Sequence, residues 1–411
     1  MTASKPSYIP TKDELVEKAR ELVPTLKERA TKAEKSCRMS DETIADVKAA
    51  GFNKIYMPKR FGGYEMDWGA HYEVGRELGR ACGSTAWTVS LVFSHIIWVA
   101  RFHPEAQEEF FAKIKDPMVS TGTAGHSVLE QTGGGYRLSG RWKFVSGIHH
   151  ADCAVVGART DPAAGFSHWV LLYPDDYTII EAWDTEGLRG TGSHDIEVKE
   201  RFLPAYRVVG REEFMNFGSP GAKLHDHYVY HMRMAPLQRS WFAAPLVGPA
   251  RGALEEYCAV TKTRTGRMFG EKIVEQVPVQ VRIGESLAQI ETAELIIDSF
   301  MRFLHERGAS GGDLLGTEVL KARRDMTIAA RLCVQATTRL AEMMGAGGQE
   351  RTNPVQRHMR DCRTVATHIE LQWDHAMAPI GRYLLGLPTG DPLVDGEQKG
   401  SGGASGALVG A

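Results

Sequence analysis

The pattern of apolar residues changes twice along this 411-residue chain, and that change restricts its fold more than any other feature. Residues 13–33 carry apolar side chains at the three- and four-residue spacing of an amphipathic helix. Ser40, followed by two acids, is typical of a helix start. Residues 85–102 are apolar almost all round, which predicts a single buried helix. The chain therefore begins with a helical domain.

From residue 117 the character changes to short β-branched runs separated by glycine-rich turns such as Gly133-Gly134-Gly135. This pattern predicts an antiparallel β domain. No G-x-G-x-x-G or P-loop motif follows a strand, so a dinucleotide-binding or P-loop fold loses support.

Helical spacing returns in the last third of the chain, over residues 253–263, 280–306, 318–344 and 353–385. Several long helices in succession favour a four-helix bundle. The predicted fold class is α+β. Its domains are an N-terminal helical domain (1–116), a middle β-sandwich or barrel (117–235), a C-terminal four-helix bundle (236–390) and a glycine-rich tail (391–411).

Composition narrows the class of protein. Lysine plus arginine number 49 and aspartate plus glutamate 51, a balance that predicts neither a nucleic-acid nor a membrane partner. No apolar run approaches the ~20 residues that span a bilayer, and the N-terminus has no apolar signal core. The six cysteines form no C-x-x-C pair, as expected in a reducing compartment. We therefore expect a cytoplasmic protein.

Several short motifs resemble those of the acyl-CoA dehydrogenase fold, in the same order along the chain. They are Pro58-Lys59-Arg60-Phe61-Gly62-Gly63, the segment Gly187–Asp195 (GLRGTGSHD), Phe202-Leu203-Pro204, and Gly345-Ala346-Gly347-Gly348 followed by Pro354, Arg357 and Arg360-Asp361. The resemblance implies that fold and a homotetramer.

Other positions are similar to one branch of that fold, the two-component flavin-dependent monooxygenases. His368, seven residues after Asp361, stands where we expect a histidine in that branch, and most dehydrogenases carry a glutamate in this stretch. Further matches are Cys82–Trp87 (CGSTAW), His95, Phe144–Ala151 (FVSGIHHA) and, loosely, Gly386–Asp391 (GLPTGD). Two departures concern the cavity: Ser120-Thr121-Gly122-Thr123 replaces a serine triplet, and Phe144 replaces a tryptophan.

This resemblance implies an oxygenase component that takes reduced FMN (or FADH2) from a separate NAD(P)H-dependent reductase. With O2 it would form a C4a-hydroperoxyflavin and hydroxylate a small aromatic, phenolic substrate. A base with a pKa near the working pH favours the phenolate, and histidine suits that task.

The same resemblance assigns roles to individual residues. The catalytic residues would be His95, Ser146 and His368, with Ser146 at the flavin N5 edge. The flavin would contact Thr121, Gly122, Thr123, Phe144, Ser146, Gly347 and Gly348, and either Arg264 or Arg267 would hold its phosphate. His95, His150 and Trp98 would border the substrate.

Alternatives remain open at this stage. Glu370 could be the base of an acyl-CoA dehydrogenase-like enzyme with bound FAD; two residues apart on a helix, it and His368 would face roughly 200° apart. The flavin could instead oxygenate nitrogen or sulfur, or the fold could have become a binding protein. His227 and His231 have the i, i+4 spacing of metal ligands, but no H-E-x-x-H glutamate accompanies them, so no metal is expected. His149 and His150 would point to opposite faces of a strand.

Overall fold

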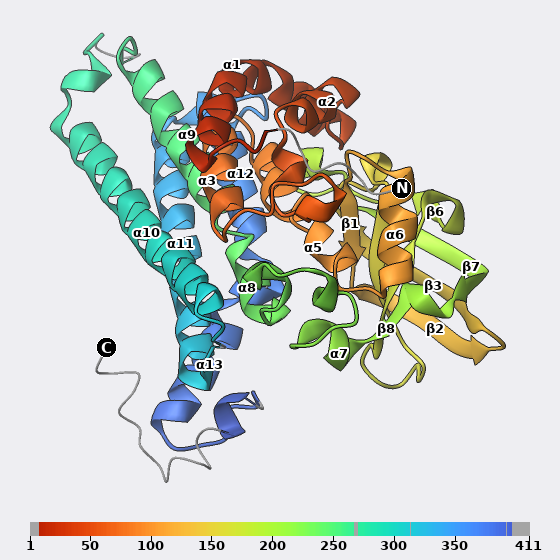
Figure 1. Ribbon diagram of the computed structural model, residues 1–411. Coiled ribbons are helices and arrows are strands. Elements are labelled where there is room, and N and C mark those ends of the chain that lie inside the picture. Colours follow the sequence, from red (N-terminus) through yellow and green to blue (C-terminus); the bar gives the residue numbers. More distant parts are fainter. Residues whose placement is uncertain (1–7, 267–269, 313, 392, 397–411) are drawn as a thin grey trace. The chain divides into compact units, whose positions relative to one another are not determined.

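The computed structural model describes residues 8–266, 270–312, 314–391 and 393–396, and Figure 1 labels their elements. The chain divides into two compact units. The first comprises described residues of Met1–Leu78, Ser84–Thr185 and Arg189–Ala235. The second comprises those of Gly79–Gly83, Glu186–Leu188 and Pro236–Ala411.

The N-terminal region is helical, as predicted. Its longer helices are α1 (Lys12–Ser36), α2 (Asp41–Ala49), α3 (Ala70–Gly79) and α6 (Pro104–Lys113). Thr11 caps α1 through a capping box, and the Ser40 hydroxyl accepts from the Thr43 N–H at the start of α2. Pro24 lies inside α1 without ending it, because the apolar stripe is buried on both sides of it.

The segment predicted as one buried helix is buried but not continuous. It forms α4 (Gly83–Trp87), a π-helical turn η3 (Thr88–Val92) and α5 (Ile96–Val99). The N–H of Phe93 donates to the carbonyl of Thr88, and the Ser94 hydroxyl donates to the carbonyl of Ser90. Single π turns inside helices are frequent at functional sites.

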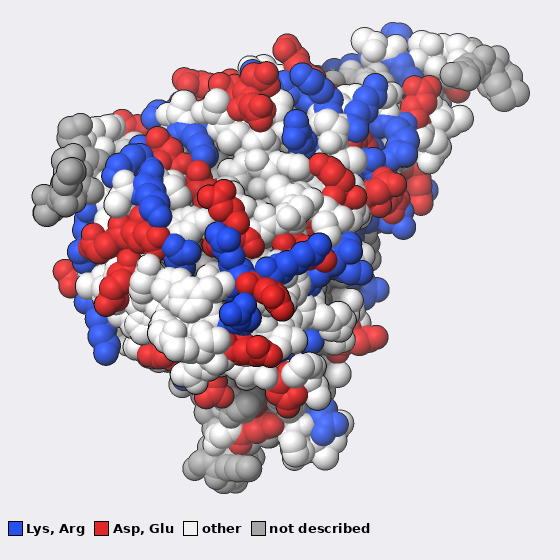
Figure 2. Space-filling model, turned by 90° about the vertical axis from the view of Figure 1, so that its right-hand side faces the viewer, with Lys and Arg blue, Asp and Glu red and all other residues white. Residues whose placement is uncertain are grey.

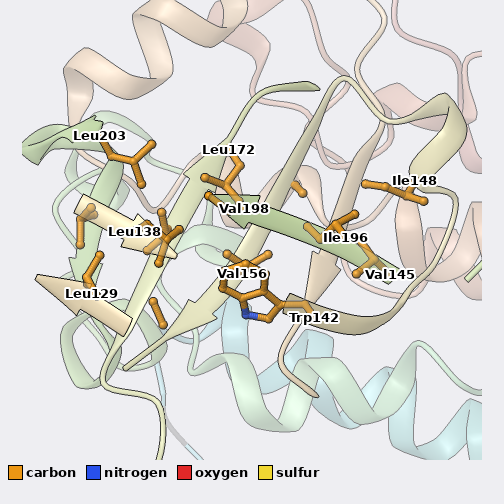
Figure 3. Close-up of a cluster of buried hydrophobic side chains, with 14 of the residues drawn as sticks. Leu129, Leu138, Trp142, Val145, Ile148, Val156, Leu172, Ile196, Val198 and Leu203 are labelled. Atoms are coloured by element: carbon orange, nitrogen blue, oxygen red, sulfur yellow. The ribbon is translucent and has the colours of Figure 1, made fainter. Parts of the chain in front are cut away.

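Two four-stranded sheets follow. The first has the order β1 (Val119–Gly122), β4 (Cys153–Ala158), β5 (His168–Leu172), β8 (Val208–Gly210). The second has the order β2 (Ala124–Thr132), β3 (Gly135–Val145), β7 (His194–Pro204), β6 (Thr178–Ile180). The predicted antiparallel arrangement is confirmed, except that β1 pairs with β4 in parallel. Buried side chains from both sheets form one core, including Trp142, Leu138, Val156 and Ile196 (Figure 3).

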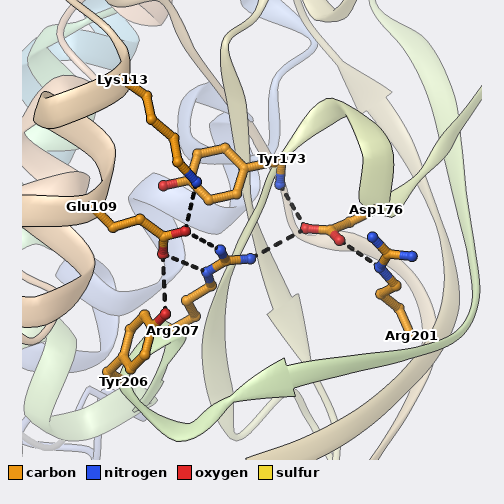
Figure 4. A network of polar contacts seen from close by, with 7 residues as sticks. All are labelled: Glu109, Lys113, Tyr173, Asp176, Arg201, Tyr206 and Arg207. Carbon is orange, nitrogen blue, oxygen red and sulfur yellow. Dashed lines mark hydrogen bonds and ion pairs between the residues drawn. The ribbon is translucent and has the colours of Figure 1, made fainter.

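A polar network attaches α6 to the β-rich part of the first unit (Figure 4). Nη2 of Arg207 lies 2.5 Å from Oε1 of Glu109, and the Tyr206 hydroxyl donates to the same carboxylate at 3.2 Å. Asp176 joins the network between Arg201, at 2.6 Å, and Arg207, at 3.6 Å. These half-buried ion pairs fix α6 against η7 (Ala205–Arg207).

The second unit is a helical bundle, as predicted. Its helices are α9 (Ala244–Thr261), α10 (Val277–Ala309), α11 (Gly316–Met343), α12 (Pro354–Ala366) and α13 (Trp373–Leu384). Helix α9 packs on α10, α11 and α12, and α11 packs on α10 and α12 (Figure 1). The prediction of one helix over 353–385 is wrong. The α-helix is interrupted at residues 367–372, where His368 caps the short turn η12 (Ile369–Leu371).

Basic and acidic side chains are interspersed over the face shown in Figure 2. Among the described helices, none is both long and apolar enough to cross a membrane. The boundaries predicted at 116, 235 and 390 stay predictions.

Candidate active site

Ser146 lies in the first unit, directly after β3, within a chain of neutral hydrogen bonds. Its hydroxyl accepts from the indole N–H of Trp87 at 3.1 Å and lies 2.8 Å from the hydroxyl of Ser193. Ser193 in turn lies 2.6 Å from the hydroxyl of Thr191. Gly147, at φ +72°, supplies the sharp turn that follows. Ser146 is only 7% exposed.

In this series of hydrogen bonds, the order of donors and acceptors can leave the hydroxyl proton of Ser146 without an acceptor in the series. An indole N–H can only donate, and a hydroxyl oxygen accepts two hydrogen bonds. If Thr191 donates to Ser193 and Ser193 donates to Ser146, the Ser146 oxygen is fully used as an acceptor. Its own O–H can then donate to a ligand.

His95 lies in the first unit, on the turn between η3 and α5. Its Nδ1 is 3.0 Å from the carbonyl oxygen of Val119, and a carbonyl only accepts, so Nδ1 carries the proton. Nε2 is therefore the acceptor nitrogen, 3.5 Å from the Thr121 hydroxyl. Burial lowers the pKa of His95 to about 3, and the hydrogen bond to Val119 opposes this shift with a smaller effect. The lowered pKa keeps the ring neutral.

The residues assigned to the flavin edge lie around Ser146 in sequence or in space. Thr121 and Gly122 end β1, and the Ser120 hydroxyl donates to the carbonyl of Ser146 at 2.6 Å. Thr123 follows and is exposed. Gly122 is buried, and a Cβ there would lie 3.0 Å from a Val145 methyl, so the position requires a very small residue.

Phe144 is a 60% exposed aromatic residue at φ +62°, an unusual backbone angle for a bulky side chain. Its ring meets that of Trp183 edge to face, with centroids 6.2 Å apart. Phe144 thus presents an aromatic ring at the surface two positions before Ser146.

Trp98, assigned to the substrate, is 1% exposed within an aromatic cluster. Its ring lies 4.4 Å from that of Trp169 and 5.3 Å from that of Phe214. The buried guanidinium of Arg101 holds the segment carrying Phe214 by donating to backbone carbonyls, those of Phe214, Asn216, Tyr230 and Met232. Burial lowers the pKa of Arg101 to about 10.

The resemblance also assigns His150 to the substrate, and in the structure its side chain contacts two groups of the protein. Nε2 lies 2.9 Å from the carbonyl of Met39, and Nδ1 lies 3.5 Å from Asp41. The expectation that His149 and His150 alternate on a strand is wrong, because both lie in the 3₁₀ turn η4 (Ile148–His150).

His368 lies in the second unit, where the N–H of Glu370 donates to its Nδ1 at 3.3 Å. A neutral ring then carries its proton on Nε2. The ring lies 4.3 Å from that of Phe242, and burial lowers the pKa of His368 while Glu370 opposes that shift. The helical-wheel argument that separated His368 from Glu370 does not apply, because neither residue is in an α-helix.

Glu370 lines a cleft of about 130 Å³ in the second unit, together with Arg239, Arg323, Ile369, His375 and Ala376. Nε of the buried Arg239 lies 2.9 Å from Oε2 of Glu370. Arg323 pairs with Asp391 at 3.0 Å. Burial lowers the pKa of Arg239, and the Glu370 carboxylate counteracts this. The cleft is ionic, and Glu370 is engaged as a counter-ion.

Arg264 and the glycine-rich turn also lie together in the second unit. The guanidinium of Arg264 donates to the carbonyls of Met343 and Met344, at 3.0 and 3.1 Å, and so caps the end of α11. Gly347 and Gly348 follow in the turn η11 (Ala346–Gln349). Arg267, the other candidate for the flavin phosphate, lies outside the described residues.

The histidines considered as metal ligands do not share a helix face. His227 caps a 3₁₀ turn and pairs with Asp67 at 3.4 Å, whereas Nε2 of His231 contacts the carbonyl of His225. Within the described residues, a different group brings possible ligand atoms within 4.8 Å of one another: His149, Glu181 and His194.

Sequence reasoning missed several residues of this region. Trp87, Thr191 and Ser193 all fall inside motifs that signalled the family, but a motif match gave them no role. His194 also falls inside such a motif without receiving a role, and Arg239 carried no sequence signal, since its partner Glu370 is distant along the chain.

Comparisons with known proteins identify the family of the chain. Residues 10–113 match the acyl-CoA dehydrogenase N-terminal domain, and residues 240–373 match the acyl-CoA dehydrogenase C-terminal domain. The chain is 30% identical to the flavin-dependent monooxygenase oxygenase subunit HsaA of Rhodococcus jostii, over 91% of this chain and 98% of that protein. It is 26% identical to the oxygenase component of p-hydroxyphenylacetate 3-hydroxylase of Acinetobacter baumannii, over 92% of this chain and 91% of that protein.

A solved structure gives the same answer. XiaF from a Streptomyces species, determined in complex with FADH2 and glycerol, superimposes with a TM-score of 0.86 at 26% identity, over 93% of this chain and 97% of that one. The predicted family is therefore confirmed: the chain belongs to the flavin-dependent monooxygenases that share the acyl-CoA dehydrogenase fold.

Proposed function

We propose that this enzyme is the oxygenase component of a two-component system, using reduced FMN (or FADH2) from a separate reductase to hydroxylate a small phenolic substrate. The observation that carries the proposal is the tautomer of His95, whose Nδ1–H donates to Val119 and whose Nε2 accepts. Relatives named for flavin-dependent and p-hydroxyphenylacetate hydroxylation support the reaction class.

His95 would act on the substrate hydroxyl. Because its pKa is lowered by burial, the ring is neutral at working pH and Nε2 can accept a hydrogen bond from a phenolic O–H. This hydrogen bond polarises the O–H bond and makes the ring carbon ortho to oxygen more electron-rich. Thr121, 3.5 Å from Nε2, would help to orient the same hydroxyl.

Ser146 and its aromatic neighbours fit an isoalloxazine ring. Ser146 would donate its remaining proton toward the N5 edge, and Phe144 and Trp183, whose rings meet edge to face, would each offer an aromatic contact. Reduced flavin, when bound, supplies the electrons that activate O2. The Thr191–Ser193–Ser146–Trp87 chain contains no charged group, so it keeps a donor in place without attracting water.

The acyl-CoA dehydrogenase alternative requires Glu370 as a base. Its carboxylate is engaged in an ion pair with Arg239, which weakens that role. Oxygenation of nitrogen or sulfur would not need an acceptor such as Nε2 of His95. A homotetrameric assembly and a cytoplasmic location stay predictions, the first testable by light scattering.

The proposal is tested by mixing the protein anaerobically with reduced FMN and then with oxygen in a stopped-flow spectrometer. We expect a flavin spectrum distinct from both the reduced and the oxidised form, persisting until a phenol is added. Immediate return of oxidised flavin would contradict the proposal. Purification with tightly bound FAD would favour the dehydrogenase.

A further inference from the structure

The second sheet brings three chain segments together beside Ser146. Val145, the last residue of β3, pairs with His194, the first residue of β7. On the other side of β7, Ile180 ends β6 opposite Asp195, so Glu181 emerges beside His194. The loop 181–184 therefore begins one strand away from Ser146.

His194 holds this loop through backbone contacts. The ring is 2% exposed, and its Nδ1 accepts from the N–H groups of Ala182, at 3.1 Å, and Trp183, at 3.2 Å. Two donors can converge only on a nitrogen without a proton. The neutral ring therefore carries its proton on Nε2, 3.3 Å from a carboxylate oxygen of Glu181.

The same geometry argues against a metal ion at this cluster. His149 also approaches Glu181, with its Nε2 2.9 Å from the carboxylate. A histidine that binds a metal normally donates from its other ring nitrogen. In His194 that other nitrogen accepts twice, so metal binding at Nε2 would require a ring that has lost both protons.

The loop that His194 holds carries Trp183, whose half-buried ring meets the exposed ring of Phe144. Phe144 belongs to β3 and lies between the paired residues Trp142 and Val145, where the register with β7 shifts. Trp183 is not in a strand, so its position depends on the anchors of the loop. One of these anchors is His194, whose Nδ1 accepts from the N–H of Trp183.

We propose that His194 is a positioning residue for flavin binding, because it holds the ring of Trp183 edge to face against Phe144, so that both rings border one site beside Ser146. The ligand of this site is a planar heterocycle, the isoalloxazine of reduced FMN. The inference rests on the proposed function, which places the flavin at Ser146 and Phe144.

The test uses two variants, each of which keeps a polar group at the position of one ring nitrogen of His194 and removes the other. In His194→Asn the amide oxygen replaces Nδ1 as acceptor for the loop. In His194→Gln the amide lies at the position of Nε2 and the loop acceptor is lost. Binding of reduced FMN is measured anaerobically by quenching of tryptophan fluorescence, and each variant is checked for folding by circular dichroism.

We expect His194→Gln to raise the Kd for reduced FMN roughly tenfold and His194→Asn to change it by less than about twofold. Trp183→Ala should weaken binding to a similar extent, and adding His194→Gln to it should have little further effect. Equal behaviour of the Asn and Gln variants, or additive effects with Trp183→Ala, would overturn the inference. If His194→Gln does not fold, unchanged FMN binding by Trp183→Ala overturns it alone.

Two further measurements separate this inference from the proposed function. If neither Phe144→Ala nor Ser146→Ala alters reduced-FMN binding, the flavin is not at this place and the proposed function fails. If both weaken binding while His194→Gln does not, only the positioning role fails. Stoichiometric Zn²⁺ binding in calorimetry that is lost in Glu181→Gln would also overturn the role, since it would show that Nε2 is a metal ligand.

Discussion

His95 in the first unit and His368 in the second are both buried histidines whose pKa is lowered by burial, yet Nε2 has the opposite hydrogen-bonding role in each. Nδ1 of His95 donates to a carbonyl, which makes Nε2 an acceptor. Nδ1 of His368 accepts from the N–H of Glu370, which makes Nε2 a donor. The backbone group facing Nδ1 thus decides whether each ring can take or give a proton.

The groups around the two rings also differ in charge. The polar contacts described around His95 and Ser146 join neutral groups. His368 instead lies two residues before Glu370, and Glu370 lines a cleft together with Arg239 and Arg323. Neutral hydrogen-bonded surroundings exclude water, while ions that line a cleft retain it. This contrast supports the proposal that the first unit holds the proton acceptor and the water-sensitive chemistry.

The largest expected effect tests the acceptor role. His95→Asn keeps an N–H for Val119 but has nothing at the position of Nε2, so hydroxylation should fall roughly 10²- to 10⁴-fold. Reduced-FMN binding should stay within about twofold. Product formation is measured by chromatography, with His95→Gln, which can present an oxygen near Nε2, as the partly active control. An Asn variant at the wild-type rate would remove His95 as the acceptor.

Ser146→Ala should have the next largest effect. Without its donor, the oxygenating flavin should decay to hydrogen peroxide roughly tenfold faster, a change worth about 1.4 kcal/mol. Peroxide release is measured in the absence of substrate. Ser120→Ala is the matched control, since its hydroxyl donates only to the Ser146 carbonyl among its described contacts. Equal leakage in both variants would show that the Ser146 hydroxyl is not needed.

The lowered pKa of His95 makes stability depend on pH. The unfolded ring has a pKa of 6.5 and the folded ring about 3, so this contribution is full above 6.5 and is lost as pH falls toward 3. At pH 5.5 the loss should be about 1.4 kcal/mol. Urea unfolding at pH 7.5 and 5.5 is compared for wild type and His95→Asn. The variant should lose less stability, and an equal loss in both would contradict the assignment.

Glu370→Gln should have the smallest effect on activity. If Glu370 serves only as the counter-ion of Arg239, hydroxylation should fall less than about threefold, while the uncompensated arginine lowers the free energy of unfolding by about 1–2 kcal/mol. The dehydrogenase alternative instead requires Glu370 as the base. Loss of activity comparable to that of His95→Asn would favour that alternative.

The sequence predicted where helices and strands lie better than it predicted the points at which helices are interrupted. The helical, β and helical blocks follow from apolar spacing, and the structure confirms them. The breaks at residues 88–92 and 367–372 were missed because their causes are hydrogen bonds such as Ser94 to Ser90 and the cap at His368. Apolar periodicity does not record such contacts.

The candidate site shows the same division. Motif resemblance assigned roles to His95, Ser146 and Phe144, and the structure adds features that fit the proposed roles: a tautomer, a chain of hydroxyl groups and an exposed ring. It could not predict the contact of His150 with Met39, which joins residues more than a hundred positions apart.

By itself, the sequence determined the fold class and the family, because apolar spacing and short motifs are local properties that survive without a partner. Only the tertiary structure decided which nitrogen of His95 accepts, which hydroxyls reach Ser146, and that Glu370 is held by Arg239. Hydrogen bonds and ion pairs act over about 3 Å, and residues distant in sequence reach that separation only when the chain has folded.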